Sequence, residues 1–173
     1  AGRYTTQDNQ ENVDREGWRG FLDLLKRYRR RRPINGVLIA ISIADLLTLA
    51  ADERQSHVNA IRSRVAELYQ HFGMRFPIYV LLTKCDLVPG FVEFFDDIGT
   101  EDRAQVWGFT MDVEESRSLG NLKETLRSEF ENLTSRLRSR VLRRMNTERD
   151  MARRAALFSY PDQMSGVLEL VQG

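Results

Sequence analysis

The segment PIYVLLTKCDLVPG, residues 77–90, places two charged side chains directly after an apolar stretch. Ile78 to Leu82 has the β-branched and aromatic composition of a buried strand, and Lys84 and Asp86 follow at its end. A carboxylate there can accept two hydrogen bonds from a planar donor pair, such as the ring NH and exocyclic amine of guanine. A lysine two residues earlier can lay its aliphatic stem along the base. These residue types are therefore compatible with recognition of a guanine base.

The spacing of Thr83, Lys84 and Asp86 is that of the [N/T]KxD motif with which GTPases bind guanine. A second interpretation needs no ligand: the lysine is a solvated strand end, and the aspartate caps the next turn. Both interpretations stay open on these residues alone. The expected position favours a ligand, because open parallel sheets bind ligands at the carboxyl ends of their strands.

The elements that position this motif follow from hydrophobic spacing. Helices are predicted over 14–30, 52–72 and 90–98, and strands over 36–43, 77–83 and 105–110. Strands that alternate with helices predict a parallel sheet with crossover helices. The continuous apolar run at 36–43 is typical of a strand covered on both faces. From Ser116 a long amphipathic helix is predicted to extend towards Phe158, with Tyr160 and Pro161 ending it.

Composition narrows the class of protein. The 173 residues are 42% hydrophobic and 29% charged, and the net charge of +1 gives no general attraction to nucleic acid or acidic lipid. Cys85 is the single cysteine, which excludes an internal disulfide and fits a reducing compartment. Residues 34–51 have about the length of a membrane span, but polar residues interrupt them. We interpret this stretch as a buried strand that continues into a helix.

Other candidate sites are weaker. His57 and His71 have no cysteine or carboxylate at metal-binding spacing, so no metal site is expected, and no catalytic residue is predicted. Cys85 is interpreted as a packing residue rather than a nucleophile. The run Arg29–Arg32 is either a solvated helix end or a contact for anionic lipid head groups.

A second group of arginines decorates the predicted C-terminal helix. We interpret them as its solvated face, which is basic enough to dock an acidic partner. No nucleic acid is expected there, because no aromatic residues interleave with the arginines. The group comprises Arg136, Arg138, Arg140, Arg143, Arg144, Arg149, Arg153 and Arg154.

Several separate segments together resemble one family. AGRYTTQD, PINGVLIAISIADLL, PIYVLLTKCDLVPGFVEFFDDI, AQVWGFT and LFSYPDQ resemble the cytoplasmic domain of the IcmF/TssM family, inner-membrane subunits of the bacterial type VI secretion system. The resemblance implies an α/β fold: a three-layer, GTPase-like parallel sheet, truncated at its N-terminus and followed by a helical extension. The expected domains are residues 1–115, a partial GTPase-like domain, and residues 116–173, the long helix and the start of the extension.

The resemblance also implies site residues. Gly2 corresponds to the switch glycine that binds the terminal phosphate, and Thr83, Lys84 and Asp86 to the base-recognition residues, with Thr83 in place of the commoner asparagine. No GxxxxGK[ST] phosphate loop occurs in these 173 residues. Without that loop phosphates lack their cradle and Mg²⁺ lacks its first protein ligand, so this chain alone is not expected to hydrolyse nucleotide. GTP or ATP with Mg²⁺ is expected only in an intact parent protein, with the loop upstream.

Three functions follow as hypotheses, the third being a basic membrane- or nucleic-acid-binding module, whose affinity would fall with added salt. In the first, the chain is the cytoplasmic part of an inner-membrane secretion anchor, which contacts membrane-complex and baseplate subunits and whose parent is regulated by a nucleotide. In the second, it belongs to a GTPase or ATPase switch. Loss of upstream strands would expose a sheet edge, so self-association is also expected.

Overall fold

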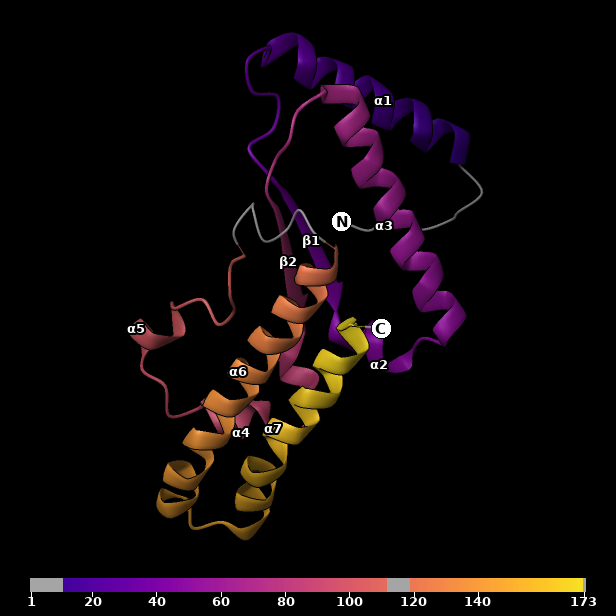
Figure 1. Cartoon of the computed structure of the whole chain (residues 1–173). Coiled ribbons are helices and arrows are strands. Elements are labelled where there is room, and N and C mark those ends of the chain that lie inside the picture. Colours follow the sequence, from indigo (N-terminus) through magenta and orange to yellow (C-terminus); the bar gives the residue numbers. More distant parts are fainter. Residues whose placement is uncertain (1–10, 112–118, 173) are drawn as a thin grey trace. The chain divides into compact units, whose positions relative to one another are not determined.

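The structure is a computed structural model that describes residues 11–111 and 119–172 (Figure 1). Its helices are α1 (Glu11–Tyr28), α2 (Ile43–Thr48), α3 (Ala51–Phe72), α4 (Phe91–Phe95), α5 (Thr100–Arg103), α6 (Leu119–Thr147) and α7 (Met151–Gln172), and a 3₁₀ turn, η1, spans Cys85–Leu87. Strands β1 (Val37–Ser42) and β2 (Ile78–Thr83) pair in a two-stranded parallel sheet.

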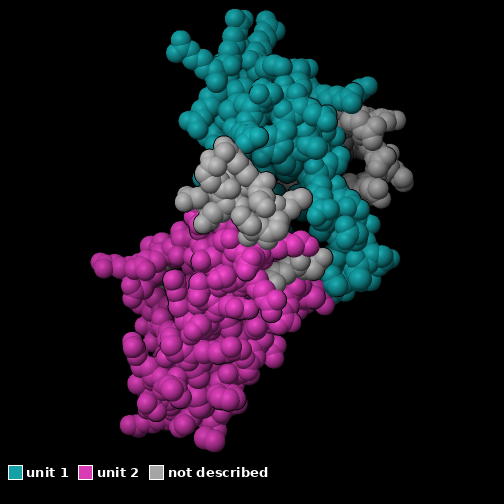
Figure 2. Space-filling model, in the orientation of Figure 1, with its two compact units in different colours: residues 1–41, 48–81 teal, residues 42–47, 82–173 magenta. Residues whose placement is uncertain are grey.

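The chain divides into two compact units (Figure 2). Unit 1 comprises residues 1–41 and 48–81, and unit 2 comprises residues 42–47 and 82–173. The carboxyl ends of both strands, residue 42 of β1 and residues 82–83 of β2, therefore belong to unit 2. The domain boundary predicted between residues 115 and 116 lies outside the described residues.

Unit 1 is built around the packing of α1 on α3. Leu22, Leu68 and Phe76 form its buried core, with Trp18 packed against them. The indole Nε1 of Trp18 donates a hydrogen bond of 2.9 Å to a carboxylate oxygen of Glu67. Because an apolar contact and a polar tether act at the same place, the register of α1 on α3 is fixed.

Helix α3 begins and ends with recognisable signals. The side chain of Glu53 accepts a hydrogen bond of 3.0 Å from the backbone N–H of Ala50, just before the helix. Gly73 follows the last turn in the left-handed conformation (φ 62°), and its N–H donates to the carbonyl oxygen of Tyr69 at 2.9 Å. The predicted helix stop at Gly73 is confirmed.

Unit 2 is dominated by the hairpin of α6 and α7, which lie side by side and antiparallel (Figure 1). Leu137 and Val141 of α6 and Leu157 and Met164 of α7 are buried in one cluster, which also takes in Phe94 of α4. The predicted helix from Ser116 is confirmed over α6, but it does not continue to Phe158.

Helix α6 ends at Thr147 because the residues that follow cap a new helix, α7. A carboxylate oxygen of Asp150 accepts a hydrogen bond of 2.9 Å from the backbone N–H of Arg153, in the first turn of α7. Helix α7 then continues through Tyr160 and Pro161, so the expected helix end there was wrong. Proline removes one helical hydrogen bond, but burial of both side chains holds the helix together.

The sheet is smaller and less covered than predicted. Residues 105–110 form no strand, and Val106 is 94% exposed. This segment pairs with neither β1 nor β2, so the strand predicted there was wrong. The prediction that β1 is covered on both faces was also wrong, because Leu38 is 67% exposed. A mixed α/β composition with a helical extension is confirmed.

Candidate functional site

Residues 83–86, with the sequence TKCD, form a tight turn at the carboxyl end of β2, called the TKCD turn below. Lys84 adopts the left-handed conformation (φ 59°, ψ 37°) and is the only residue other than glycine with positive φ in the part of the chain that the structure describes. Its carbonyl oxygen accepts a hydrogen bond of 3.1 Å from the N–H of Leu87, and that of Cys85 accepts one of 3.0 Å from Val88. A lysine in this conformation costs about 1–2 kcal/mol. Such local strain is concentrated at functional sites, which favours a role for this turn.

The side chains of the turn differ in their exposure to solvent. Those of Lys84 and Asp86 are exposed, whereas Cys85 between them is half-buried and packs against the core of unit 2. Neither charged side chain has an ion pair or hydrogen bond with another of the described residues. The chemistry required to bind a base, a free carboxylate beside a free lysine, is therefore present in the turn.

The surroundings of Cys85 are those of a packing residue. Its thiol donates a hydrogen bond of 3.4 Å to the carbonyl oxygen of Leu82. Burial, and secondarily the negative charge of Asp86, raise the pKa of the Cys85 thiol above its ordinary value. A raised pKa opposes formation of the nucleophilic thiolate, which agrees with the interpretation of Cys85 as a packing residue.

Gly90 joins this turn to helix α7. It has φ +88°, and a Cβ built on it would lie 2.5 Å from the carbonyl oxygen of Ala156 and 2.9 Å from the Cβ of Tyr160. The glycine of the Pro-Gly pair after the motif is thus explained, because only glycine permits both the conformation and this close approach. Val88 and Tyr160 are buried beside it in the same core.

The hydroxyl of Tyr160 is buried with no hydrogen-bond partner in the described part of the chain. Burial, followed by the nearby Cys85, raises the pKa of this phenol above its ordinary value. Sequence reasoning did not find this pair, because the two residues are far apart in the chain.

The site residue Gly2 lies outside the described residues. Across residues 11–111 and 119–172, no cluster of histidine, cysteine and carboxylate side chains could hold a metal ion. The described turn thus presents an exposed lysine and an exposed carboxylate, and no described residue is assigned to phosphates or to Mg²⁺.

The sequence suggested that the C-terminal arginines form one solvated face. The structure shows that some of them are buried or paired instead. Arg144 is 8% exposed, donates to the carbonyl oxygen of Glu93 at 2.6 Å, and pairs with the carboxylates of Asp96 and of Asp97. Arg140 also binds Asp97, at 2.7 Å. These bonds fasten α6 to the segment after α4, and only the tertiary structure reveals them.

The other arginines of the group either form an ion pair with a carboxylate or form none. Arg153 pairs with Asp96 and Glu148, and Arg138 pairs with Asp162. The others have no ion pair within the described ranges: Arg136, Arg143, Arg149 and Arg154.

None of the helices in the described ranges combines the length and the apolar character needed to cross a membrane. No solved structure matches the chain. The family model for the IcmF-related N-terminal domain matches residues 11–172. Over 169 residues, 98% of this chain, the sequence is 52% identical to the type VI secretion system component TssM1 of Pseudomonas aeruginosa, although the chain spans only 15% of that relative's length. With a family match and a relative that both extend over nearly all of its residues, the chain belongs to the IcmF/TssM family.

Proposed function

We propose that this chain is the cytoplasmic segment of a type VI secretion anchor in the bacterial inner membrane. In this proposal its role is structural: it joins membrane-complex subunits to baseplate subunits. The observation that carries the proposal is the 52% identity to TssM1 across 98% of the chain. The relative is much longer, so the membrane-spanning parts belong to the proposed parent protein.

The α6–α7 hairpin is the proposed contact surface for an acidic partner subunit. Buried apolar residues join its two helices to each other and to α4, and ion pairs join the helices to each other and to the segment after α4, which makes the surface rigid. Arg136 and Arg143 lie exposed on α6 with no ion pair among the described side chains. A preformed cationic surface favours association with an acidic surface.

A chimera tests this function. The segment of P. aeruginosa TssM1 that matches this chain is replaced by the chain itself, and release of a type VI substrate into the medium is measured. We expect secretion to be retained, and to fall when the chimera also carries Arg136→Glu and Arg143→Glu. A control carries Arg127→Glu and Glu131→Arg, which reverse an exposed ion pair on α6. A chimera that is present at the normal level in the membrane but does not secrete would contradict the proposal.

Nucleotide regulation of the parent is a second proposed function, in which the chain completes a GTPase or ATPase switch. The observation that favours it is the strained Lys84 beside the exposed Asp86. A bound nucleotide would supply phosphates and Mg²⁺, and Asp86 and Lys84 would orient the base. The proposal includes a three-layer, GTPase-like sheet in the parent, in which further strands and a phosphate loop from upstream join β1 and β2.

Calorimetric titration with Mg²⁺-GTP, Mg²⁺-GDP and Mg²⁺-ATP tests base recognition. We expect binding that is selective for guanine and lost in Asp86→Ala. Glu169→Ala, at an exposed carboxylate on α7, is the matched control and should bind as the unchanged chain does. If the unchanged chain binds no nucleotide, or if both variants bind equally, Asp86 is only a polar strand end.

We further propose that isolated copies of this chain associate through the sheet. Each strand has one hydrogen-bonded neighbour, and Val80 of β2 is 54% exposed. Unpaired strand edges with apolar side chains are templates for pairing. Sedimentation should show association that increases with concentration and is weakened by Val80→Lys, whereas a monomer at every concentration would refute it.

A further inference from the structure

The end of α1 carries a dense positive surface. Arg27, Tyr28 and the run Arg29–Arg32 line an open hollow of about 570 Å³, and all six are exposed. None of these arginines has an ion pair with a carboxylate in the described ranges. One or two cations complement the negative end of a helix, but five are more than that role requires.

Apolar side chains lie next to these arginines on the same helix. Phe21, Leu24 and Tyr28 follow one another at spacings of three and four residues, and they are 49%, 53% and 76% exposed. They are not the residues that attach α1 to α3, since Trp18 and Leu22 make that contact. The exposed residues therefore form a second apolar face.

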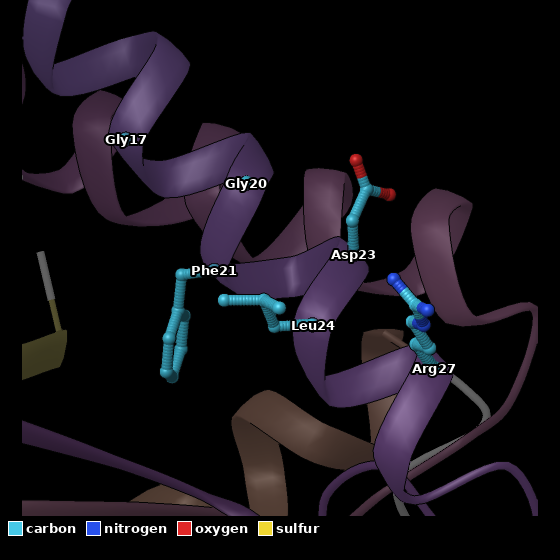
Figure 3. A pocket seen from close by; sticks show the side chains of 6 residues that line it. All are labelled: Gly17, Gly20, Phe21, Asp23, Leu24 and Arg27. Carbon is cyan, nitrogen blue, oxygen red and sulfur yellow. The ribbon is translucent and has the colours of Figure 1, made fainter.

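This face is open. Phe21 and Leu24 lie on the same side of the helix, with Asp23 directed away from them (Figure 3). Gly17 and Gly20 line a second hollow together with Phe21 and Leu24, and a Cβ at either glycine would meet no atom within 4 Å. The helix backbone can thus be approached closely.

The helix is also held in place. Lys26 donates a hydrogen bond of 2.9 Å to the carbonyl oxygen of His71, and the carboxylate of Asp23 lies 3.3 Å from the ring of His71. Both contacts join α1 to the end of α3. Asp23, which lines the second hollow, is thus directed towards α3 instead of pairing with the arginines.

We infer that the exposed face of α1 and the arginine run that follows it bind an anionic lipid surface. Guanidinium groups bind the phosphates of lipid head groups, and the aromatic and aliphatic side chains enter the boundary between head groups and acyl chains. A nucleic acid or a purely acidic segment would match the charge, but it would leave Phe21 and Leu24 exposed to water. The inference stands on these residues and does not rest on the proposed function.

Vesicle flotation of the full chain tests the inference. Vesicles of phosphatidylcholine alone are compared with vesicles that also contain phosphatidylglycerol. We expect binding only to the anionic vesicles, about 30-fold weaker for the double variant Arg30→Gln and Arg31→Gln, because each charge contributes about fivefold in affinity. Arg62→Gln with Lys123→Gln removes the same charge from exposed positions on α3 and α6 and should leave binding unchanged. An equal loss in both double variants would overturn the assignment to α1.

The apolar face is tested separately. Phe21→Ser with Leu24→Ser should weaken binding to anionic vesicles and make the remaining binding more sensitive to salt, because only screened charge interactions remain. Far-UV circular dichroism checks that the helices persist, and Tyr28→Ser is the alternative variant if they do not. If poly-glutamate or duplex DNA binds as tightly as the anionic vesicles, and the apolar variants change nothing, the surface recognises acidic polymers and the lipid inference is wrong.

Discussion

Substitution of Gly90 by alanine tests how the TKCD turn is attached to the helical hairpin. Gly90 has φ +88°, and the added methyl carbon would lie 2.5 Å from the carbonyl oxygen of Ala156 and 2.9 Å from the Cβ of Tyr160. The contact with the carbonyl oxygen of Ala156 would be about an ångström shorter than an ordinary van der Waals contact of a Cβ. The segment before α4 must therefore move away from α7, or the backbone must leave its present conformation.

The expected loss combines three effects. The positive φ costs alanine about 1–2 kcal/mol, and forced repacking of a filled core costs about 1–3 kcal/mol. Alanine also restricts the unfolded chain, which returns about 0.4–1 kcal/mol. We expect Gly90→Ala to lower the free energy of unfolding by about 2–4 kcal/mol, a large part of the 5–15 kcal/mol typical of a domain.

Two other glycines provide matched controls. Gly73 also has positive φ, but a Cβ there would meet nothing within 4 Å, so Gly73→Ala isolates the conformational cost and should lose about 1 kcal/mol. Gly166 lies exposed in α7 with open space around it, and Gly166→Ala should gain about 1 kcal/mol.

Urea unfolding followed by far-UV circular dichroism measures all three variants. Amide hydrogen exchange of α4 and α7 shows whether the loss in Gly90→Ala is located in unit 2. If Gly90→Ala loses no more than Gly73→Ala, the close packing of the turn on α7 does not limit stability, and the reasoning fails.

The other predictions concern charge, reactivity and strain. The ion pair with Arg153 lowers the pKa of Glu148 from 4.5 to about 2, so its contribution to stability is complete above pH 4.5 and is lost as the pH falls through about 2; acid unfolding of Glu148→Gln should lack this component. Burial raises the pKa of Cys85, so alkylation at mildly alkaline pH should be slower in the folded chain than in urea, and equal rates would contradict this. Arg144→Ala should lower the free energy of unfolding by about 2–3 kcal/mol, because it leaves partly buried carboxylates with fewer partners; a change below about 0.5 kcal/mol would be typical of a surface substitution. Lys84→Gly should raise stability by about 0.5–1 kcal/mol by relieving the left-handed strain, measured by urea unfolding, and should at the same time weaken any guanine binding.

The sequence alone located the elements whose signals are local. The apolar spacing predicted α1, α3 and α6, and the β-branched runs predicted β1 and β2, because a helix or strand must repeat its apolar residues with its own period. Gly73 was found as a helix stop for the same reason, since its conformation is decided by its neighbours. The TKCD turn was placed correctly at the end of β2, and its role as a base-binding site remains a prediction.

Only the tertiary structure decided what depends on residues far apart in the chain. The approach of Gly90 to α7, the burial of Arg144 among carboxylates, and the meeting of Cys85 with Tyr160 leave no periodic signal in the sequence. The same holds for what is left uncovered: the sequence marked Phe21 and Val80 as apolar, but only the arrangement of the helices and strands showed that both are exposed. Periodicity tells which residues must avoid water within one element, whereas exposure depends on whether another element is there to cover them.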